Sequence, residues 1–187
     1  MTGYAITGSF CTHKKSLEIL RILVHRGLEI VPILSENVYN TSTRFGTSSE
    51  LISTVEEITG KRAVHTICEA ELFGPAIPLD ALIIAPCTGN TLAKMANGIT
   101  DTAVCMTAKA HMRQSRPLLI ALASNDALSA NLSNIATMIN KKNVFFVPLR
   151  QDDPQAKPHS LVCDFSKLTE SYDKMLQGKQ SRPLFIQ

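Results

Sequence analysis

The stretch from Ala81 to Thr91 reads A-L-I-I-A-P-C-T-G-N-T, and it decides the fold of this chain. Its first five residues are continuously apolar, which is typical of a strand that is buried on both faces of a parallel sheet. Pro86 has no N–H to donate to a sheet ladder, so we expect the strand to end there. The polar residues that follow would then cap a helix at the carboxyl end of the strand.

Further apolar runs alternate with helical patterns along the chain, and Leu17, Leu20 and Val24 share one face of the first such pattern. Predicted strands are 4–7, 29–34, 81–85, 118–123 and 144–147, and predicted helices are 14–26, one ending near 60, 91–97, 101–115, 126–141 and 165–176. Between them we expect a polar loop at 40–48, a short edge strand and one helical turn within 61–78, and a loop at 148–158.

This alternation predicts an α/β fold, in which a doubly wound parallel sheet of five or six strands lies between helices in a flavodoxin-like, three-layer arrangement. We expect one domain over residues 1–187. Its core would span 3–150, and a C-terminal loop and helix would span 151–187.

The composition excludes several classes of protein. The 187 residues include 19 Lys and Arg against 16 Asp and Glu, with only 5% aromatic residues, so neither the charge nor the aromatic content favours nucleic acid binding. The five cysteines show no zinc-binding or disulfide spacing, and the apolar runs are strand-sized. We therefore expect a cytoplasmic protein with a small-molecule ligand, no metal centre and no contact with membranes.

Small polar residues follow the predicted strands. Gly8 and Ser9 follow the first, Ser35 follows the second, and Thr88 and Asn90 follow the strand at 81–85. Ligands of open α/β sheets bind at the carboxyl ends of the strands, where glycine admits close approach and helix N-termini attract anions. The pattern favours a crevice for a phosphate-bearing cofactor over plain turns in which Ser and Thr only cap helices. No G-x-G-x-x-G motif is present, so we expect no tight nicotinamide site.

Residues 85–101 resemble the A-P-x-[ST]-x-N-T-x-A-K-x-A-x-G-x-x-D signature of the homo-oligomeric flavin-containing cysteine decarboxylase superfamily, and the resemblance covers residues 3–150. It implies FMN as the cofactor. The implied cofactor-binding residues are Gly8, Ser9, Ser35, Pro86, Thr88, Asn90 and Thr91. The catalytic His and the P-x-M-N-x-x-M clamp of the decarboxylases are missing, since the chain has 72–75 and 123–128 in their places. Cysteine decarboxylation is therefore not expected.

Three further stretches, 41–46, 124–128 and 151–160, resemble the B subunits of dipicolinate synthases from spore-forming bacteria. This resemblance implies a part in oxidising dihydrodipicolinate to dipicolinate during sporulation, in the cytoplasm of the mother cell, alongside the nucleotide-binding A subunit of dipicolinate synthase. A substrate with two carboxylates needs cations near the crevice, and Arg44 and Lys157 are the predicted substrate-binding residues. The sequence assigns no catalytic residue.

Two alternatives remain open. The stretch from Pro86 to Gly98 is also similar to flavin prenyltransferases, although the Arg-Glu-Thr-Pro of that family is replaced here by residues 124–127. The second alternative is a non-catalytic FMN-binding scaffold subunit.

The superfamily resemblance also implies a homo-oligomer. An apolar helix face is the predicted contact surface between subunits, and it comprises Ala103, Val104, Met106 and Thr107. His13 is the histidine nearest the predicted crevice.

Overall fold

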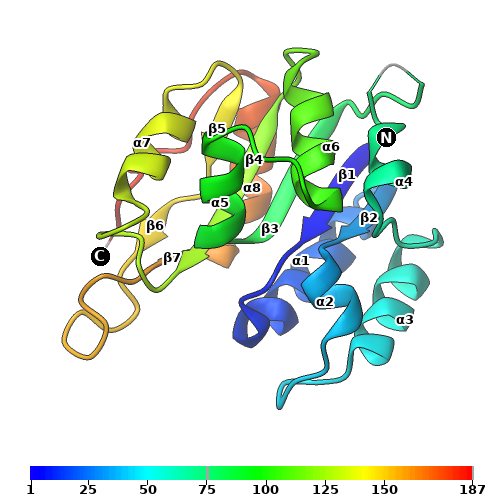
Figure 1. The fold of residues 1–187 in the computed structure, drawn as a ribbon. Helices are drawn as coiled ribbons and strands as arrows, with labels where there is room; N and C mark the ends of the chain where they lie inside the picture. The colour runs from blue at the N-terminus through cyan, green and yellow to red at the C-terminus, as the bar shows by residue number, and fades with distance from the viewer. Residues whose placement is uncertain (75, 187) are drawn as a thin grey trace.

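One mixed sheet of seven strands runs through the molecule in the computed structural model, which describes residues 1–74 and 76–186 (Figure 1). The strands are β1 (Thr2–Ile6), β2 (Ile30–Leu34), β3 (Ala81–Thr88), β4 (Leu118–Ser124), β5 (Val144–Phe146), β6 (Leu149–Arg150) and β7 (Leu161–Cys163). Their order is β2-β1-β3-β4-β7-β6, and β5 pairs with β4 beside this path. Strands β1 to β5 are parallel, whereas β7 is antiparallel to both β4 and β6.

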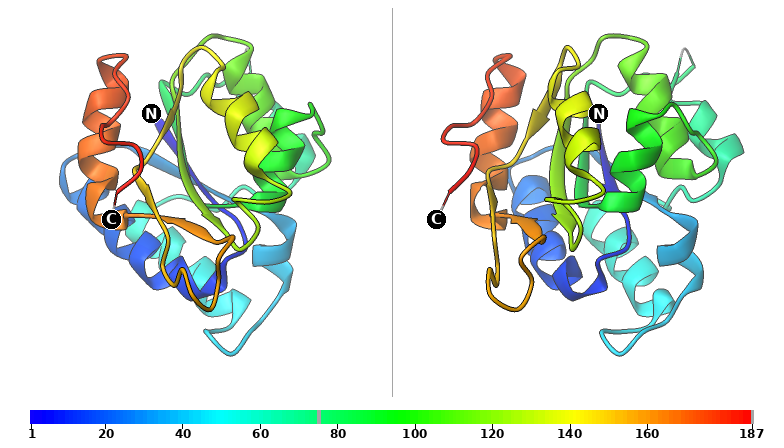
Figure 2. Two further views of the ribbon diagram at one scale, coloured as in Figure 1. Left: turned by 90° about the vertical axis from the view of Figure 1, so that its left-hand side faces the viewer. Right: turned by 60° about the vertical axis from the view of Figure 1, so that its left-hand side comes forward.

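The helices complete three layers. They are α1 (His13–His25), α2 (Glu36–Asn40), α3 (Ser48–Thr59), α4 (Ile67–Glu71), α5 (Gly89–Ala96), α6 (Ala103–Met112), α7 (Leu132–Ile139) and α8 (Leu168–Leu176), with 3-10 turns η1 (Phe10–Thr12) and η2 (Phe165–Lys167). Helices α5, α6 and α7 cover one face of the sheet, and α1 and α8 cover the other (Figure 2). Helix α3 packs beside α1, and α4 packs on α6. No helix in the described ranges is long and apolar enough to cross a membrane.

The predicted three-layer, doubly wound arrangement is confirmed, and its five parallel strands are present. The predicted number of strands is too small, because two short strands are added, of which β6 lies inside the expected 148–158 loop and β7 follows it. These strands have two and three residues, so they show no alternation that a sequence pattern could reveal.

Several predicted boundaries are also wrong. Strand β3 continues to Thr88. A bulge at Ala85 and Pro86 interrupts the pairing where Pro86 has no N–H to donate, and Cys87 then pairs with β4 again. Helix α7 begins at Leu132 rather than near 126. The expected edge strand within 61–78 is only an isolated bridge at Val64, whereas the expected helical turn there is α4.

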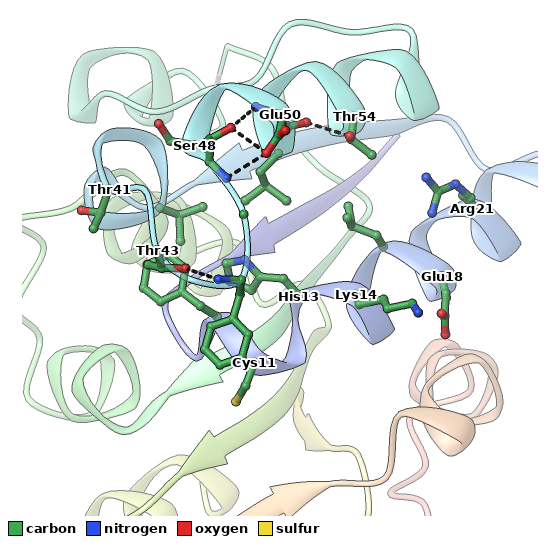
Figure 3. Close-up of a pocket in the computed structure, with 17 residues that line it drawn as sticks. Cys11, His13, Lys14, Glu18, Arg21, Thr41, Thr43, Ser48, Glu50 and Thr54 are labelled. Atoms are coloured by element: carbon green, nitrogen blue, oxygen red, sulfur yellow. Dashed lines mark hydrogen bonds between the residues drawn. The ribbon is translucent and has the colours of Figure 1, made fainter.

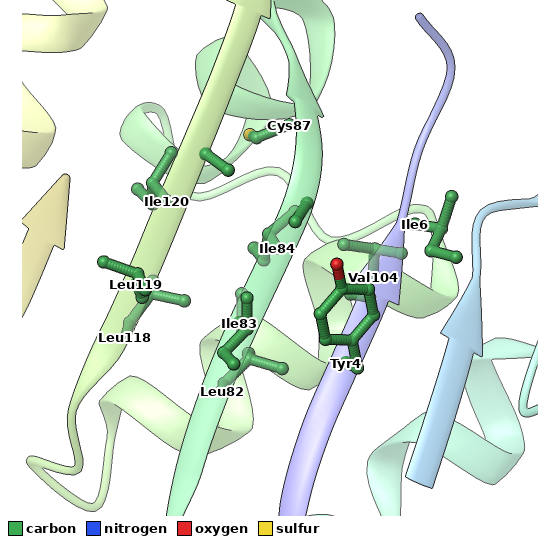
Figure 4. Packing of buried hydrophobic residues seen from close by; sticks show 14 of the residues in the cluster. Tyr4, Ile6, Leu82, Ile83, Ile84, Cys87, Val104, Leu118, Leu119 and Ile120 are labelled. Carbon is green, nitrogen blue, oxygen red and sulfur yellow. The ribbon is translucent and has the colours of Figure 1, made fainter. Parts of the chain in front are cut away.

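Side chains of the central strands and of α6 pack together in the hydrophobic core (Figure 4). Every residue of β1 and β4 is buried. Ala103, Val104 and Thr107 are also completely buried within the single chain, where α6 packs against β2 and β4. The prediction that these three residues form a contact surface between subunits is therefore wrong. A helix that is covered both by a sheet and by neighbouring helices is apolar around most of its circumference. Its sequence pattern therefore resembles that of a helix with an exposed apolar face.

The chain reverses direction across the sheet between β1 and β3. From β1 it passes through α1 to β2 on one side, and from β2 it returns to β3 on the other side. Ligands of open α/β sheets bind outside the carboxyl ends of the strands at such a switch point.

Candidate functional site

A crevice of about 270 Å³ lies at the carboxyl ends of β1, β2 and β3, and we refer to it as the crevice. It is lined by Thr7, Gly8, Ser35, Glu36, Asn37, Thr88, Asn90, Thr91, Lys94, Asp101 and Thr102. The strand ends therefore converge on one site, as the sequence predicts.

Thr7 joins the two strands that flank the switch point. Its hydroxyl donates to the carbonyl of Pro86 at 2.8 Å and accepts from the backbone N–H of Thr88 at 3.0 Å. The strand ends lie so close that a Cβ at Gly8 would stand 3.2 Å from the methyl carbon of Thr88. A glycine here keeps the backbone of residue 8 open to a ligand.

Backbone N–H groups near the crevice favour an anion. Ser9 adopts the left-handed conformation (φ 64°, ψ 49°) just before η1. Ser35 caps α2, and Thr88 caps α5 by accepting from the N–H of Thr91 at 3.2 Å. The first N–H groups of a helix have no partner within it and carry a partial positive charge. Three chain turns thus offer donors suited to a phosphate group.

The charged side chains that line the crevice are one cation, Lys94, and two carboxylates, Glu36 and Asp101. Lys94 pairs with Asp101 at 2.9 Å, and this contact lowers the pKa of the Asp101 carboxyl. The Oε1 atom of Glu36 accepts from the N–H of Ala103 at 2.9 Å. Its Oε2 atom is buried and has no hydrogen-bond partner in the described part of the chain. A ligand with a hydroxyl or N–H donor would satisfy this buried acceptor.

A polar cluster behind the crevice packs against Gly89, the first residue of α5. Ser124 and Asn131 donate to the same carboxylate oxygen of Asp126, at 2.5 and 2.9 Å. These hydrogen bonds lower the pKa of Asp126, which keeps it ionised at neutral pH. A Cβ at Gly89 would stand 2.4 Å from the Ser124 hydroxyl oxygen, so only glycine fits there. The cluster fixes the start of α5 and hence the positions of Thr88 and Asn90.

A second, larger cavity of about 560 Å³ lies between α1 and α3, and we call it the α1–α3 cavity (Figure 3). Its lining comprises Phe10, Cys11, His13, Lys14, Leu17, Glu18, Arg21, Val38, Thr41, Thr43, Phe45, Gly46, Thr47, Ser48, Glu50, Leu51 and Thr54. Lys14, Glu18 and Arg21 follow one another along α1, and Glu50 and Thr54 lie on α3. The 41–46 stretch forms one wall of this cavity.

No residue lines both cavities, but two chain segments connect them, and we call these segments the shared wall. Residues 7–13 run from the crevice into the α1–α3 cavity, and so do residues 35–38. His13 stabilises this wall, because its Nε2–H donates to the carbonyl of Thr7 at 2.9 Å. Burial lowers the pKa of His13, so the ring is neutral at pH 7.

Five of the seven predicted cofactor residues line the crevice, namely Gly8, Ser35, Thr88, Asn90 and Thr91. Ser9 and Pro86 do not line it. Ser9 shapes the turn after Gly8, and Pro86 is buried, with its carbonyl accepting from Thr7.

Neither predicted substrate residue lines the crevice or the α1–α3 cavity as the structure describes them. The guanidinium of Arg44 stacks over the ring of its neighbour Phe45, 4.9 Å from the centroid, on the exposed tip of the loop. Lys157 pairs with Asp152 at 3.0 Å within the 151–160 loop, and this contact raises the pKa of Lys157.

Sequence reasoning assigned none of the charged residues that line the two cavities, among them Lys14, Arg21 and Glu36. Lys14 and Arg21 are seven residues apart with Leu17 between them, a spacing that places all three on one face of α1. This signal was available in the sequence. Glu36 gave no such signal, because α2 has only five residues and its burial depends on contact with α6.

Comparisons with known proteins agree with the fold. A family model described as Flavoprotein matches residues 2–177. The B subunit of dipicolinate synthase from Bacillus subtilis (strain 168) is 40% identical over 185 residues, which cover 99% of this chain and 92% of that protein.

Two solved structures are also similar. The crystal structure of the dipicolinate synthase B subunit from Bacillus halodurans C is 41% identical, with a TM-score of 0.91, and the match covers 100% of this chain and 95% of that chain. DmrB of Burkholderia xenovorans, solved in complex with FMN as a cubic protein cage, has a TM-score of 0.70 at 17% identity, covering 94% of each chain. At that identity the likeness to DmrB concerns the fold.

Proposed function

The chain belongs to the flavoprotein family and, within it, to the dipicolinate synthase B subunits, and on this premise we propose that it oxidises dihydrodipicolinate to dipicolinate together with the separate A subunit of that enzyme. The reaction removes one hydride and one proton from the dihydropyridine ring and leaves an aromatic ring. The protein must therefore hold the ring, orient it toward a hydride acceptor and release the proton to water or a base.

FMN is the proposed cofactor, and when bound it supplies the two-electron acceptor. The residues of the crevice fit it. The backbone at Gly8 and the start of α5 would hold the phosphate, while Thr88, Asn90 and Thr91 offer neutral hydrogen-bonding groups. The buried Oε2 atom of Glu36 would accept from a ligand hydroxyl or ring N–H.

The α1–α3 cavity is the proposed substrate site. Lys14 and Arg21 line it, and neither forms an ion pair with any residue in the described ranges. Two free cations along one cavity match the two carboxylates of the substrate. The observation that carries the proposal is the wall shared by the two cavities, because it places these cations beside the cofactor crevice. This assignment replaces Arg44 and Lys157, which point elsewhere.

The biological setting follows from the same premise. We propose that the protein acts during sporulation, in the cytoplasm of the mother cell, and that it forms a homo-oligomer. The description of DmrB as a cubic protein cage supports assembly of this kind of chain.

The test uses ultraviolet absorbance of dipicolinate after incubation of this chain alone, of the A subunit alone, and of both together. We expect product only from the mixture. Full activity from either chain alone would contradict the two-subunit proposal, and no product from the mixture would contradict the reaction itself.

Substitutions on α1 test where the substrate binds. Lys14→Ala and Arg21→Ala should each weaken the apparent substrate affinity roughly tenfold to a hundredfold, because a hydrogen bond to a charged group contributes about 1.5–3 kcal/mol. Lys15→Ala is the matched control, since Lys15 is exposed on α1 but does not line the cavity. Equal behaviour of all three variants would place the substrate elsewhere.

A separate titration tests the cofactor. Glu36→Gln keeps an oxygen for the N–H of Ala103 but loses the carboxylate acceptor, so FMN affinity should fall roughly tenfold or more. Quenching of flavin fluorescence measures it, and an unchanged affinity would remove Glu36 from the cofactor site.

A further inference from the structure

A group of four cations surrounds a third cavity, of about 570 Å³, and we call it the basic patch. Lys109 lies on α6 and Arg113 directly follows it, whereas Lys141 and Lys142 follow α7. Helices α5, α6 and α7, which frame it, lie side by side on one face of the sheet (Figure 1). No carboxylate lines this cavity in the described part of the chain, and none of the four cations forms an ion pair there.

The basic patch lies at the far end of the helices from the crevice. Thr102 caps α6 in the crevice, whereas Arg113 follows the last turn of the same helix. Eleven residues of helix span roughly 16 Å at 1.5 Å per residue. Arg113 is therefore too far from the crevice to contact a ligand there, and none of the four cations lines the crevice or is used in the proposed chemistry.

The four positive charges repel one another. Lys109 and Arg113 are four residues apart on a helix, a spacing at which like charges are destabilising, and Lys141 and Lys142 are adjacent. The C-terminal ends of α6 and α7 favour nearby cations. That effect does not explain why Ile99, which is 47% exposed, lies among them.

The exposure of these residues favours a protein ligand over a small molecule. Small-molecule sites place their charged groups inside an enclosed pocket, whereas all four cations here are exposed at the rim. Met95, Ile99 and Met112 form an apolar centre within a charged rim. Protein–protein interfaces likewise combine an apolar core with a polar rim. Exposed rim charges steer an oppositely charged partner and speed its association.

The acidic residues of this chain favour a partner of a different kind over a second copy. Among the described residues, the acids whose side chains have no hydrogen-bond or ion-pair partner are Glu18, Glu57 and Glu71. They lie on three different helices, α1, α3 and α4, so this chain has no cluster of free carboxylates to match four cations.

We propose that the basic patch is the surface on which an acidic face of the second kind of chain in the enzyme docks. This inference rests on the proposed function, because it identifies the surface through which the two chains act together. It places the docked chain on the α5–α7 face, at the end away from the crevice.

The test measures association of the two full chains by isothermal titration calorimetry at low and high salt. Lys109→Glu/Arg113→Glu should weaken association at least tenfold and flatten its salt dependence. Arg62→Glu/Lys179→Glu changes the net charge by the same amount at exposed positions outside the patch, and it should alter association less than twofold. Both variants should keep the FMN affinity and unfolding temperature of the parent.

Three results would overturn the proposal: no association of the parent chains, equal association of the patch variant and its control, or loss of self-association in the patch variant alone. The last would identify a second copy as the occupant. The proposed function fails separately, when the parent chains associate but form no dipicolinate.

Discussion

The backbone N–H of Thr88 donates to the side-chain hydroxyl of Thr7 at 3.0 Å, and this hydrogen bond holds β3 against β1 at the mouth of the crevice. The same hydroxyl donates to the carbonyl of Pro86, just before the point where β3 rejoins β4. One buried side chain therefore bonds to two backbone groups of the bulged segment, the carbonyl of Pro86 and the N–H of Thr88.

Thr7→Val should remove both hydrogen bonds while keeping the shape of the side chain. A buried N–H left without a partner costs about 1–3 kcal/mol, so we expect a lower free energy of unfolding in denaturant. Thr7→Ser keeps the hydroxyl and is the matched control, with a loss below that of the valine variant. If valine and serine destabilise equally, the hydroxyl is not what holds the strands together.

Gly89→Ala should be destabilising although alanine is ordinarily the better helix former. The helical preference for alanine is worth about 1 kcal/mol, whereas overpacking a buried site costs about 1–3 kcal/mol. The added methyl would stand 2.4 Å from the Ser124 hydroxyl oxygen, so overpacking prevails. Thermal unfolding measures it. Ser124→Ala in the same chain removes the nearest atom, and it should restore part of the lost stability.

Of the five thiols, two should react with a thiol reagent in the folded protein and three should be protected. Cys11 and Cys68 are exposed, whereas burial raises the pKa of Cys87, Cys105 and Cys163 and shields them from reagents. A disulfide reagent should therefore label two thiols quickly in the folded protein. Cys11 also lines the α1–α3 cavity, so dipicolinate should slow its labelling while Cys68 serves as the internal control. Rapid labelling of a third thiol would contradict the fold.

Stability should fall as the pH drops below about 6.5. His111 donates from Nε2 to the carbonyl of Pro117 at 2.8 Å, and burial lowers its pKa from the usual 6.5. Below that pH the unfolded chain binds a proton that the folded chain resists, so the free energy of unfolding decreases until the pH reaches the lowered value. His111→Gln keeps a donor but cannot titrate, so its unfolding temperature should change less between pH 7 and pH 5. Identical pH profiles would exclude His111 as the cause.

The strand ends were predictable from the sequence because each element there has a local signature. Gly8, Ser35 and Thr88 each follow an apolar run, and parallel strands bring their carboxyl ends to one edge. The α1–α3 cavity was not predictable, because its walls come from elements that meet only in the folded chain. The direction of Arg44 depends on stacking with Phe45, which a charge pattern does not reveal.

The wall shared by the crevice and the α1–α3 cavity links the two binding equilibria. A ligand that displaces the backbone between Thr7 and His13 changes the shape of the neighbouring cavity as well as its own. Thermodynamic reciprocity then requires that each ligand alters the affinity of the other by the same factor. Coupling between the cofactor and substrate affinities would then run through this seven-residue segment, which the hydrogen bond from His13 to Thr7 ties together.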